Sequence, residues 1–578
     1  MRVALLSPPG RLPTVVYDPG SWWSELVGLG MEPRRLNLNA AWWKTLCSAP
    51  GAEAAQARSG TMLRWLSHQD LRASADEAGR GLEALREPDT YGTPDRFIRS
   101  VTPLARYLSA LNEAQGDLFF HIDFGVRVSG LDYGDSRALV SYARRGTPLS
   151  SLISAALDAI SEQVDLVIMT VSRPEELLSA LIAVRLLKLR QPGLHACLAD
   201  HSHENFTLAT HLDRLRTSGT LDSVFDTIIE QKDERDVLVP WVAGQLADGR
   251  TIRGFLSGAP PLRPVRQHPP VVIPPSETFC AEPILWTRLS PRRCYWDRCS
   301  FCALNAKFSD PRSPSIQSVA GALDRLQAAT ELGYHTINFG DEALSPAIVE
   351  RLSLGILERG IEVRWACCCK LEMAYTPALF GLMRAAGCYE IFWGLESISP
   401  RVLRLMHKDV PGLDRARIGR ILREANRAAL GLHVSLMAGF PGDALVDVAD
   451  TVAFVVETLH DLSNATFNLN RFMLLDGSPI MADPDRYGVI PEPATGDMPF
   501  RRRYQLNEAL AGETHLIDRE LPKLRRRLYQ GLGWDRIGSG PGVETALDLH
   551  FFFGQGSLFK QSGGHRFANP LRSTEAAA

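Results

Sequence analysis

Residues 284–302 have the sequence ILWTRLSPRRCYWDRCSFC, a short apolar stretch followed by a loop with three cysteines. Cys294, Cys299 and Cys302 follow a C-x4-C-x2-C spacing and account for three of the ten cysteines in the chain. Three thiols crowded into one loop indicate metal ligation, redox chemistry or a disulfide. Which of these applies depends on the fold around the loop and on the compartment.

The apolar stretch before the cysteines is the first of six, and helical patterns such as SIQSVAGALDRLQAATELG (315–333) fill the gaps between them. The candidate strands are 284–289, 336–339, 362–366, 390–393, 433–438 and 466–472. Six β/α units predict a partial (β/α)6 barrel of the TIM type. Chemistry in such barrels lies in the loops after the carboxyl ends of the strands, and the cysteine loop has that position.

The N-terminal region also alternates strands with helices. We expect strands at 2–7, 35–38, 165–170, 195–199 and 226–230, with helices at 21–29 and from Pro174. Apolar strands joined by helices predict a Rossmann-like, doubly wound parallel sheet, although 45–115 fit it poorly and are interpreted as an insertion. The predicted α/β chain therefore divides into a Rossmann-like domain (1–258), a proline-rich linker (259–278), the partial barrel (279–488) and a helical, basic C-terminal region (489–578).

The composition narrows the class of protein. With 578 residues, 45% hydrophobic and 22% charged, the chain has the composition of a soluble globular protein of two or three domains. A net charge of −3 offers no overall attraction to nucleic acid or to an anionic membrane. The N-terminus lacks a secretion signal, so we expect a cytoplasmic protein with reduced thiols. Disulfides are then excluded, and metal ligation or redox chemistry remains.

Zinc and an iron–sulfur cluster make different demands on the loop. A structural zinc ion takes four nitrogen or sulfur ligands, and no fourth Cys or His follows Cys302 at zinc-finger spacing. A [4Fe–4S] cluster held by three thiolates has one iron open to a substrate or cofactor. We therefore favour such a cluster, with a structural zinc site and a chance grouping as the alternatives.

At this point the residues resemble the radical SAM superfamily, and in particular its cobalamin-dependent members. The usual spacing there is C-x3-C-x2-C, whereas some cobalamin-associated members have the longer gap with a Cys-Tyr-Trp segment, as in this chain. Further segments are similar to family motifs and occur in the expected order: NFGDE, RWACCCKLE, WGLESISPRVLRLMHK, AGFPG and RFMLLDGSPIMADPDRYG. They extend the resemblance over about 200 residues.

The resemblance implies roles for particular residues. Cys294, Cys299 and Cys302 would hold the [4Fe–4S] cluster. S-adenosylmethionine (SAM) would be bound by residues in the loops after the first five barrel strands: Phe301, Asp341, Glu342, Lys370, Glu396, Ser397, Gly439 and Pro441. Each acidic residue has an ordinary alternative, Asp341 and Glu342 as exposed loop acids and Glu396 as a helix N-terminal charge. Cys367, Cys368 and Cys369 are interpreted as small residues at a strand end.

The chemistry that the resemblance implies is radical formation. One electron from the reduced cluster would cleave SAM to methionine and a 5′-deoxyadenosyl radical, which abstracts hydrogen from an unreactive carbon. Relatives with this closing segment bind cobalamin in the N-terminal domain, and we expect the same here. The chain has no Asp-x-His-x-x-Gly motif, and His201 and His203 are interpreted as loop residues. The pairs Trp22-Trp23 and Trp42-Trp43 either wall a flat ligand or pack in the core.

These observations predict a cobalamin-dependent C-methyltransferase that acts on an unactivated carbon of a natural product or peptide precursor. A flavodoxin or ferredoxin would supply electrons, and neither nucleic acid nor membrane is an expected partner. The alternatives are a cobalamin-independent radical SAM enzyme that performs cyclisation or rearrangement, and a non-catalytic iron–sulfur or zinc protein. The basic groups at 501–503 and 525–527 are interpreted as a solvated helix face. The alternative is that they bind an acidic peptide or a phosphate.

Overall fold

The structure is a computed structural model of the whole chain. It describes residues 1–13, 15–17, 22–56, 64–91, 94–114, 117–122, 125–160, 162–171, 173–200, 211–229, 235–256, 278–281, 284–289, 294–303, 319–460, 462 and 465–532. Most of the proline-rich linker predicted at 259–278 lies outside these ranges.

The N-terminal lobe is built on a six-stranded parallel sheet. In spatial order its strands are β3 (Glu32–Leu36), β1 (Arg2–Leu6), β6 (Leu166–Val171), β7 (His195–Asp200), β8 (Thr227–Ile229) and β9 (Gly254–Leu256). The chain reverses direction across the sheet between β1 and β6, which is the mark of a doubly wound fold. The prediction of a Rossmann-like sheet is confirmed.

Helices cover both faces of this sheet, because alternate strand residues are apolar on both sides. Val3 and Leu5 face one core with α1 (Trp22–Gly28) and α10 (Arg235–Ala247), whereas Ala4 and Leu6 face the other. The second face carries α2 (Leu38–Leu46), α7 (Pro148–Asp158) and α8 (Pro174–Arg190). Two further helices in this lobe are α6 (Ser136–Ala143) and α9 (Leu212–Ser218).

The region that fitted the alternation poorly is helical. It contains α3 (Ala49–Gln56), α4 (Arg64–Ala84) and α5 (Pro94–Ala114), followed by the hairpin of β4 (Leu118–His121) and β5 (Gly125–Val128). These helices add no strand to the sheet and pack into the core that α2 and α7 share. The interpretation of an insertion agrees with this arrangement.

The second lobe contains a seven-stranded parallel sheet. Its spatial order is β15 (Ala465–Arg471), β14 (Gly431–Ala438), β13 (Cys388–Glu396), β12 (Arg364–Cys369), β11 (Thr336–Leu344), β10 (Ile284–Thr287) and β2 (Val15–Tyr17). All six predicted strands are present in sequence order, which confirms the partial barrel. The seventh, β2, comes from the N-terminal region and pairs Val15 with Ile284.

The edge strand β2 was not predicted, because a three-residue strand after a proline shows no periodicity. Its Val-Val-Tyr sequence suits a strand, and pairing covers the otherwise exposed edge of β10. The division at 258 therefore does not separate all of the N-terminal region from the barrel.

Helices on the outside of the second sheet share one apolar core with it. They are α11 (Val319–Glu331), α12 (Pro346–Arg359), α13 (Pro377–Ala385), α15 (Arg415–Arg427) and α16 (Leu445–Leu459). The short helix α14 (Pro400–Leu405) follows β13. Helices α12, α13 and α14 begin with a Ser or Thr cap followed by proline, at Ser345-Pro346, Thr376-Pro377 and Ser399-Pro400. This pairing starts a helix soon after each strand ends.

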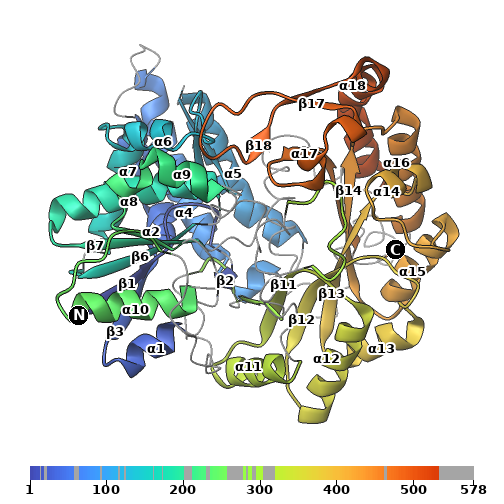
Figure 1. Cartoon of the computed structure of the whole chain (residues 1–578), viewed down its shortest axis with the longest axis horizontal. Helices are drawn as coiled ribbons and strands as arrows, with labels where there is room; N and C mark the ends of the chain where they lie inside the picture. The colour runs from blue at the N-terminus through green and yellow to red at the C-terminus, as the bar shows by residue number, and fades with distance from the viewer. Residues whose placement is uncertain are drawn as a thin grey trace.

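Among the described residues of the predicted C-terminal region (489–578), the α-helix is α18 (Glu508–Gly531). Before it come α17 (Pro479–Ala482) and two short antiparallel pairs, β16 (Leu474–Leu475) with β18 (Arg501–Arg502) and β17 (Val489–Pro491) with β19 (Tyr504–Leu506). Arg501 and Arg502 therefore lie on a strand and not on a helix. Figure 1 shows the two lobes side by side, with the segment between β17 and β18 extending toward the blue-to-green lobe.

Candidate functional site

The cysteine loop lies at the carboxyl edge of the second sheet, directly after β10. Its centre is fixed by Ser300, a fully buried residue. The Ser300 amide donates to the Met406 carbonyl at 3.0 Å, and its hydroxyl donates to the Leu405 carbonyl at 3.0 Å. The Ile480 amide in turn donates to the Ser300 carbonyl at 3.0 Å. The loop is thus held between the end of α14 and the start of α17.

The two aromatic residues in the four-residue gap anchor its other end. The Tyr295 hydroxyl donates a hydrogen bond to a carboxylate oxygen of Glu372. The Trp296 indole N–H donates to the His407 carbonyl at 2.9 Å. The Lys370 ammonium lies 3.5 Å from the centre of the Trp296 ring, a close cation–π contact. The Cys-Tyr-Trp segment therefore ties the loop to the chain after β12 and after α14.

All three cysteine side chains of the loop are partly exposed. Burial raises the pKa of the Cys294 thiol, and it raises the pKa of Cys299 to about 11, although Lys408 and Lys370 act to lower it. A metal would displace these thiol protons on binding. Within the described residues, no three His, Cys, Asp or Glu side chains are grouped closely enough to hold a metal ion.

Two buried lysines face this loop. Lys370 is 4% exposed, and its ammonium has no hydrogen-bond partner among the described residues. Burial lowers its pKa to about 8. Burial also acts to lower the pKa of Lys408, but the Glu396 carboxylate and Cys299 raise it by more. Three partly exposed thiols beside two buried ammonium groups fit an anionic iron–thiolate group, because the cations would offset its charge.

Glu396 is held by Lys408 in an unusual backbone conformation. The Lys408 ammonium lies 2.8 Å from the Glu396 carboxylate. Glu396 has a φ of +62°, which is strained for a residue with a side chain. A Cβ at Gly394 would lie 2.7 Å from the Lys408 nitrogen, so a larger residue there would displace the lysine side chain. Lys408 was not among the predicted site residues, although it ends the WGLESISPRVLRLMHK segment.

Ser397 and Asp341 are both committed to internal hydrogen bonds. Ser397 is 3% exposed; its hydroxyl accepts from the Ser399 amide at 3.1 Å and lies 3.4 Å from that of Thr451. The Asp341 carboxylate accepts from the Leu289 amide at 2.8 Å and so holds the chain that leads into the cysteine loop. Asp341 is 2% exposed and is therefore not the exposed loop acid of the ordinary alternative.

Glu342 pairs with an arginine of the neighbouring strand end. The Arg288 guanidinium lies 2.5 Å from the Glu342 carboxylate, and both side chains are at most 10% exposed. The negative charge of Glu342 acts to raise the pKa of Cys294, which places this carboxylate within electrostatic reach of the cysteine loop. Glu342 therefore belongs to the same end of the sheet as the thiols.

The turn after β14 contacts the cysteine loop through aromatic rings. The Phe301 ring lies 6.5 Å from the Phe440 ring in an edge-to-face arrangement. The neighbouring residue Pro441 is buried. Gly439 has a φ of +71°, and its carbonyl accepts from the Arg471 guanidinium at 2.6 Å. A side chain at Gly439 would collide with that guanidinium, which explains the glycine.

The N-terminal sites are defined less fully. His201 and His203 lie outside the described residues. Trp22, Trp42 and Trp43 are at most 1% exposed, and the Trp43 indole donates to the Gly10 carbonyl at 3.1 Å. The packing alternative is therefore correct for these three tryptophans. Burial also agrees with core packing for Cys367 and Cys369, whose sulfur atoms lie 3.6 Å apart.

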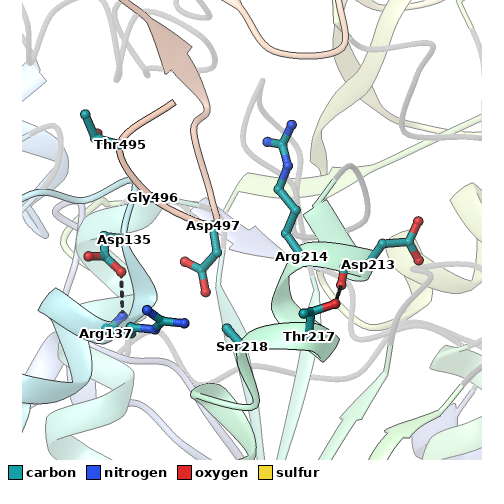
Figure 2. Close-up of a pocket in the computed structure, with 9 residues that line it drawn as sticks. All are labelled: Asp135, Arg137, Asp213, Arg214, Thr217, Ser218, Thr495, Gly496 and Asp497. Atoms are coloured by element: carbon teal, nitrogen blue, oxygen red, sulfur yellow. Dashed lines mark hydrogen bonds between the residues drawn. The ribbon is translucent and has the colours of Figure 1, made fainter. Parts of the chain in front are cut away.

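A pocket of about 470 Å³ lies where the segment between β17 and β18 meets the N-terminal lobe (Figure 2). Its lining residues are Asp135, Arg137, Asp213, Arg214, Thr217, Ser218, Thr495, Gly496 and Asp497. Asp497 accepts from the Ser136 amide at 2.8 Å and from its hydroxyl at 2.5 Å. Arg214 lies 3.5 Å from Asp476, which also pairs with Arg502 at 3.1 Å. These charges join the two lobes.

Comparisons with known proteins agree with this geometry. Residues 290–455 match the family model described as the Radical SAM superfamily, and this part of the chain is a radical SAM domain. Over 184 residues the chain is 25% identical to an uncharacterized methyltransferase, PH0819, of Pyrococcus horikoshii. That match covers 31% of this chain and 38% of the relative. The chain therefore matches about two-fifths of the length of this curated relative.

The whole chain also has the fold of a solved structure. It is similar to the radical S-adenosylmethionine methyltransferase TsrM from Kitasatospora setae, determined with cobalamin and a [4Fe–4S] cluster bound, with a TM-score of 0.54 at 13% identity over 100% of this chain and 99% of that one. A second TsrM structure contains tryptophan as substrate and a SAM analogue. The cobalamin-dependent enzyme OxsB matches with a TM-score of 0.46 at 15% identity over 78% of each chain.

Among the described residues, no helix is both long enough and apolar enough to cross a membrane.

Proposed function

We propose that this protein is a cobalamin-dependent radical SAM enzyme, a C-methyltransferase that acts on an unactivated carbon of a natural product or peptide precursor. The observation that carries the proposal is the arrangement at the carboxyl edge of the second sheet. Three thiols lie there on a pinned loop, beside buried Lys370 and Lys408 and within electrostatic reach of Glu342 and Glu396. A zinc scaffold has no need for buried cations and carboxylates around its ligands.

The residues of the chain would have these roles. Cys294, Cys299 and Cys302 hold the [4Fe–4S] cluster, and Lys370, which lacks a hydrogen-bond partner among the described residues, binds the SAM carboxylate. Glu396 and Ser397 contact the ribose and methionine portions, and Asp341 and Glu342 the amino group. Phe301, Gly439 and Pro441 enclose the adenine. When bound, the cluster supplies the electron that cleaves SAM and the corrinoid carries a methyl group.

The division of labour between the lobes is part of the proposal. The N-terminal region, about 1–258, holds the corrinoid, and the barrel at about 279–488 holds the cluster and SAM. The likeness of the whole chain to TsrM supports this assignment, since both lobes are covered. A flavodoxin or ferredoxin supplies electrons, and the substrate is a small molecule or a peptide.

One observation favours a second candidate, a radical SAM enzyme without cobalamin that performs cyclisation or rearrangement: the chain has no Asp-x-His-x-x-Gly motif. The absorption spectrum of protein purified with hydroxocobalamin separates the two. A corrinoid spectrum that stays with the protein through gel filtration is the expected result. Loss of the corrinoid, with 5′-deoxyadenosine still formed from SAM and dithionite, would favour the second candidate.

A further inference from the structure

Lys408 lies close to the cysteine loop, and hydrogen bonds from the loop hold the chain that leads to it. It follows α14, whose last turn receives both hydrogen bonds from Ser300. Ser300 lies between the cluster ligand Cys299 and Phe301 in the sequence, and the Lys408 ammonium is 5.9 Å from the centre of the Phe301 ring. The loop and the lysine therefore cannot move apart without breaking these bonds.

The charge of Lys408 is shared between one carboxylate and the thiols. Its side chain is 10% exposed and that of Glu396 is 11% exposed, so water screens the pair weakly. Electrostatic interactions of Lys408 extend to Cys299 and Cys302. Among the described residues, Glu396 is the one carboxylate in salt-bridge contact with Lys408. The charge of Lys408 also acts to lower the pKa of Cys294, so all three proposed cluster ligands lie in the field of this largely buried cation.

The local sequence is shaped around this ion pair. Gly394 leaves space that any Cβ would fill, 2.7 Å from the lysine nitrogen and 3.1 Å from the Glu396 carboxylate. Glu396 adopts its positive φ where β13 ends and turns toward the lysine. A surface salt bridge needs no residue in a strained backbone conformation. The strained conformation of Glu396 therefore indicates that the ion pair has a role other than adding stability.

We propose that Lys408 is a positioning residue that holds Glu396 toward SAM and makes the cluster easier to reduce. The inference rests on the proposed function, because it concerns the same cluster. Reduction adds one electron to the cluster from a low-potential donor such as dithionite or a flavodoxin. A fixed positive charge near the three ligand thiolates stabilises the added negative charge, since the interaction is strong in a poorly hydrated site. The negative charge of Glu396 acts in the opposite direction and makes the cluster harder to reduce.

The test is a redox titration of the reconstituted full-length protein, followed by the EPR signal of the reduced cluster. Lys408→Met keeps the length of the side chain and removes the charge, so the midpoint potential should shift to a more negative value. Lys408→Arg keeps the charge and should have a midpoint potential close to that of the wild type. Glu396→Gln should have a more positive midpoint potential. Lys523→Met, at an exposed lysine of α18, is the matched control and should leave the potential unchanged.

Each outcome decides the matter. A wild-type chain that takes up no iron and sulfide overturns the proposed function and this inference together. A normal cluster whose potential is the same in wild type, Lys408→Met and Glu396→Gln overturns the inference alone. Should Lys408→Met fail to retain its cluster, the Glu396→Gln variant decides by the sign of its shift. A shift in the same direction for both variants also contradicts the proposal.

Discussion

The carboxyl edges of the two parallel sheets differ in how they are built. At the edge of the second sheet, buried charges meet across strand ends, as in Arg288 with Glu342 and Lys408 with Glu396. At the described edge of the first sheet, the loop after β1 is held by neutral contacts, and the ion pair of Glu175 with Arg127 after β6 leaves its arginine 42% exposed. Asn39 donates to the Arg11 carbonyl at 2.6 Å and accepts from the Gly10 amide at 3.0 Å.

This difference explains why a site at the edge of the second sheet could be predicted from the sequence, whereas a site at the edge of the first sheet could not. A site that holds metal and a charged cofactor needs particular residue types, because thiolates, ammonium groups and carboxylates cannot be exchanged for one another. A site that binds through backbone amides and shape can use many sequences. The proposed cluster site could therefore be inferred from its motifs, whereas the proposal of corrinoid binding in the first lobe rests on the resemblance of the closing segment and on the overall fold.

The largest expected effect is at the charged edge itself. Cys299→Ala removes a proposed cluster ligand, so iron uptake should fall and formation of 5′-deoxyadenosine from SAM should be abolished. Cys197→Ala is the matched control, since Cys197 is buried in the first sheet, away from the loop. Product formation by Cys299→Ala at the wild-type rate would show that this thiol holds no cluster.

Lys370→Met should give the next largest effect. It removes the charge proposed to bind the SAM carboxylate, and loss of a charge-assisted hydrogen bond should raise the KM for SAM roughly 10- to 100-fold. The stability of the unliganded protein should change little, because relief of a buried ammonium without a hydrogen-bond partner offsets the loss of its cation–π contact with Trp296. The check is SAM-dependent kinetics together with urea unfolding of the apo protein. An unchanged KM, or marked loss of stability, would count against the assignment.

Much of this edge was predicted correctly, and its omissions have physical reasons. All six barrel strands and the position of the cysteine loop follow from periodicity and turn residues, which are local signals. Lys408 was missed because its position depends on the hydrogen bond of Ser300 to Leu405 and on its own contact with Phe301, both more than 100 residues away in the chain. The short edge strand β2 was missed because its partner, β10, lies in the other lobe.

Asp443 provides a pH-dependent test within the second lobe. Burial raises the pKa of its carboxyl group to about 7. In the unfolded chain the group ionises near its ordinary value of about 4, so the wild type should lose stability as the pH rises from about 4 to 7, with no further loss above. Asp443→Asn can still accept from the Gly439 amide and avoids this loss. Its advantage in urea unfolding should therefore grow over that range, to at most about 4 kcal/mol.

An advantage of Asp443→Asn that is the same at pH 5 and pH 8 would contradict this account. The exposed carboxylate of Glu457 offers a matched control, because Glu457→Gln should change stability little at any pH.

The smallest expected effect concerns the junction of the lobes. Asp497→Ala removes the acceptor for the Ser136 amide and hydroxyl and should lower the free energy of unfolding by about 1–2 kcal/mol. Thr495→Ala, which removes a solvent-exposed hydrogen bond to Asp132, should cost less than about 0.5 kcal/mol. Urea unfolding measures both. Equal effects of the two changes would mean that the Asp497 contact is not a specific junction between the lobes.

The central claim is that the three thiolates of the cysteine loop hold a [4Fe–4S] cluster with one iron open to SAM. The most direct measurement is the EPR spectrum of the anaerobically reconstituted, reduced protein before and after addition of SAM. We predict about four irons per chain and a reduced-cluster signal that changes when SAM binds. Zinc in place of iron and sulfide, or a cluster signal that SAM does not alter, would contradict the claim.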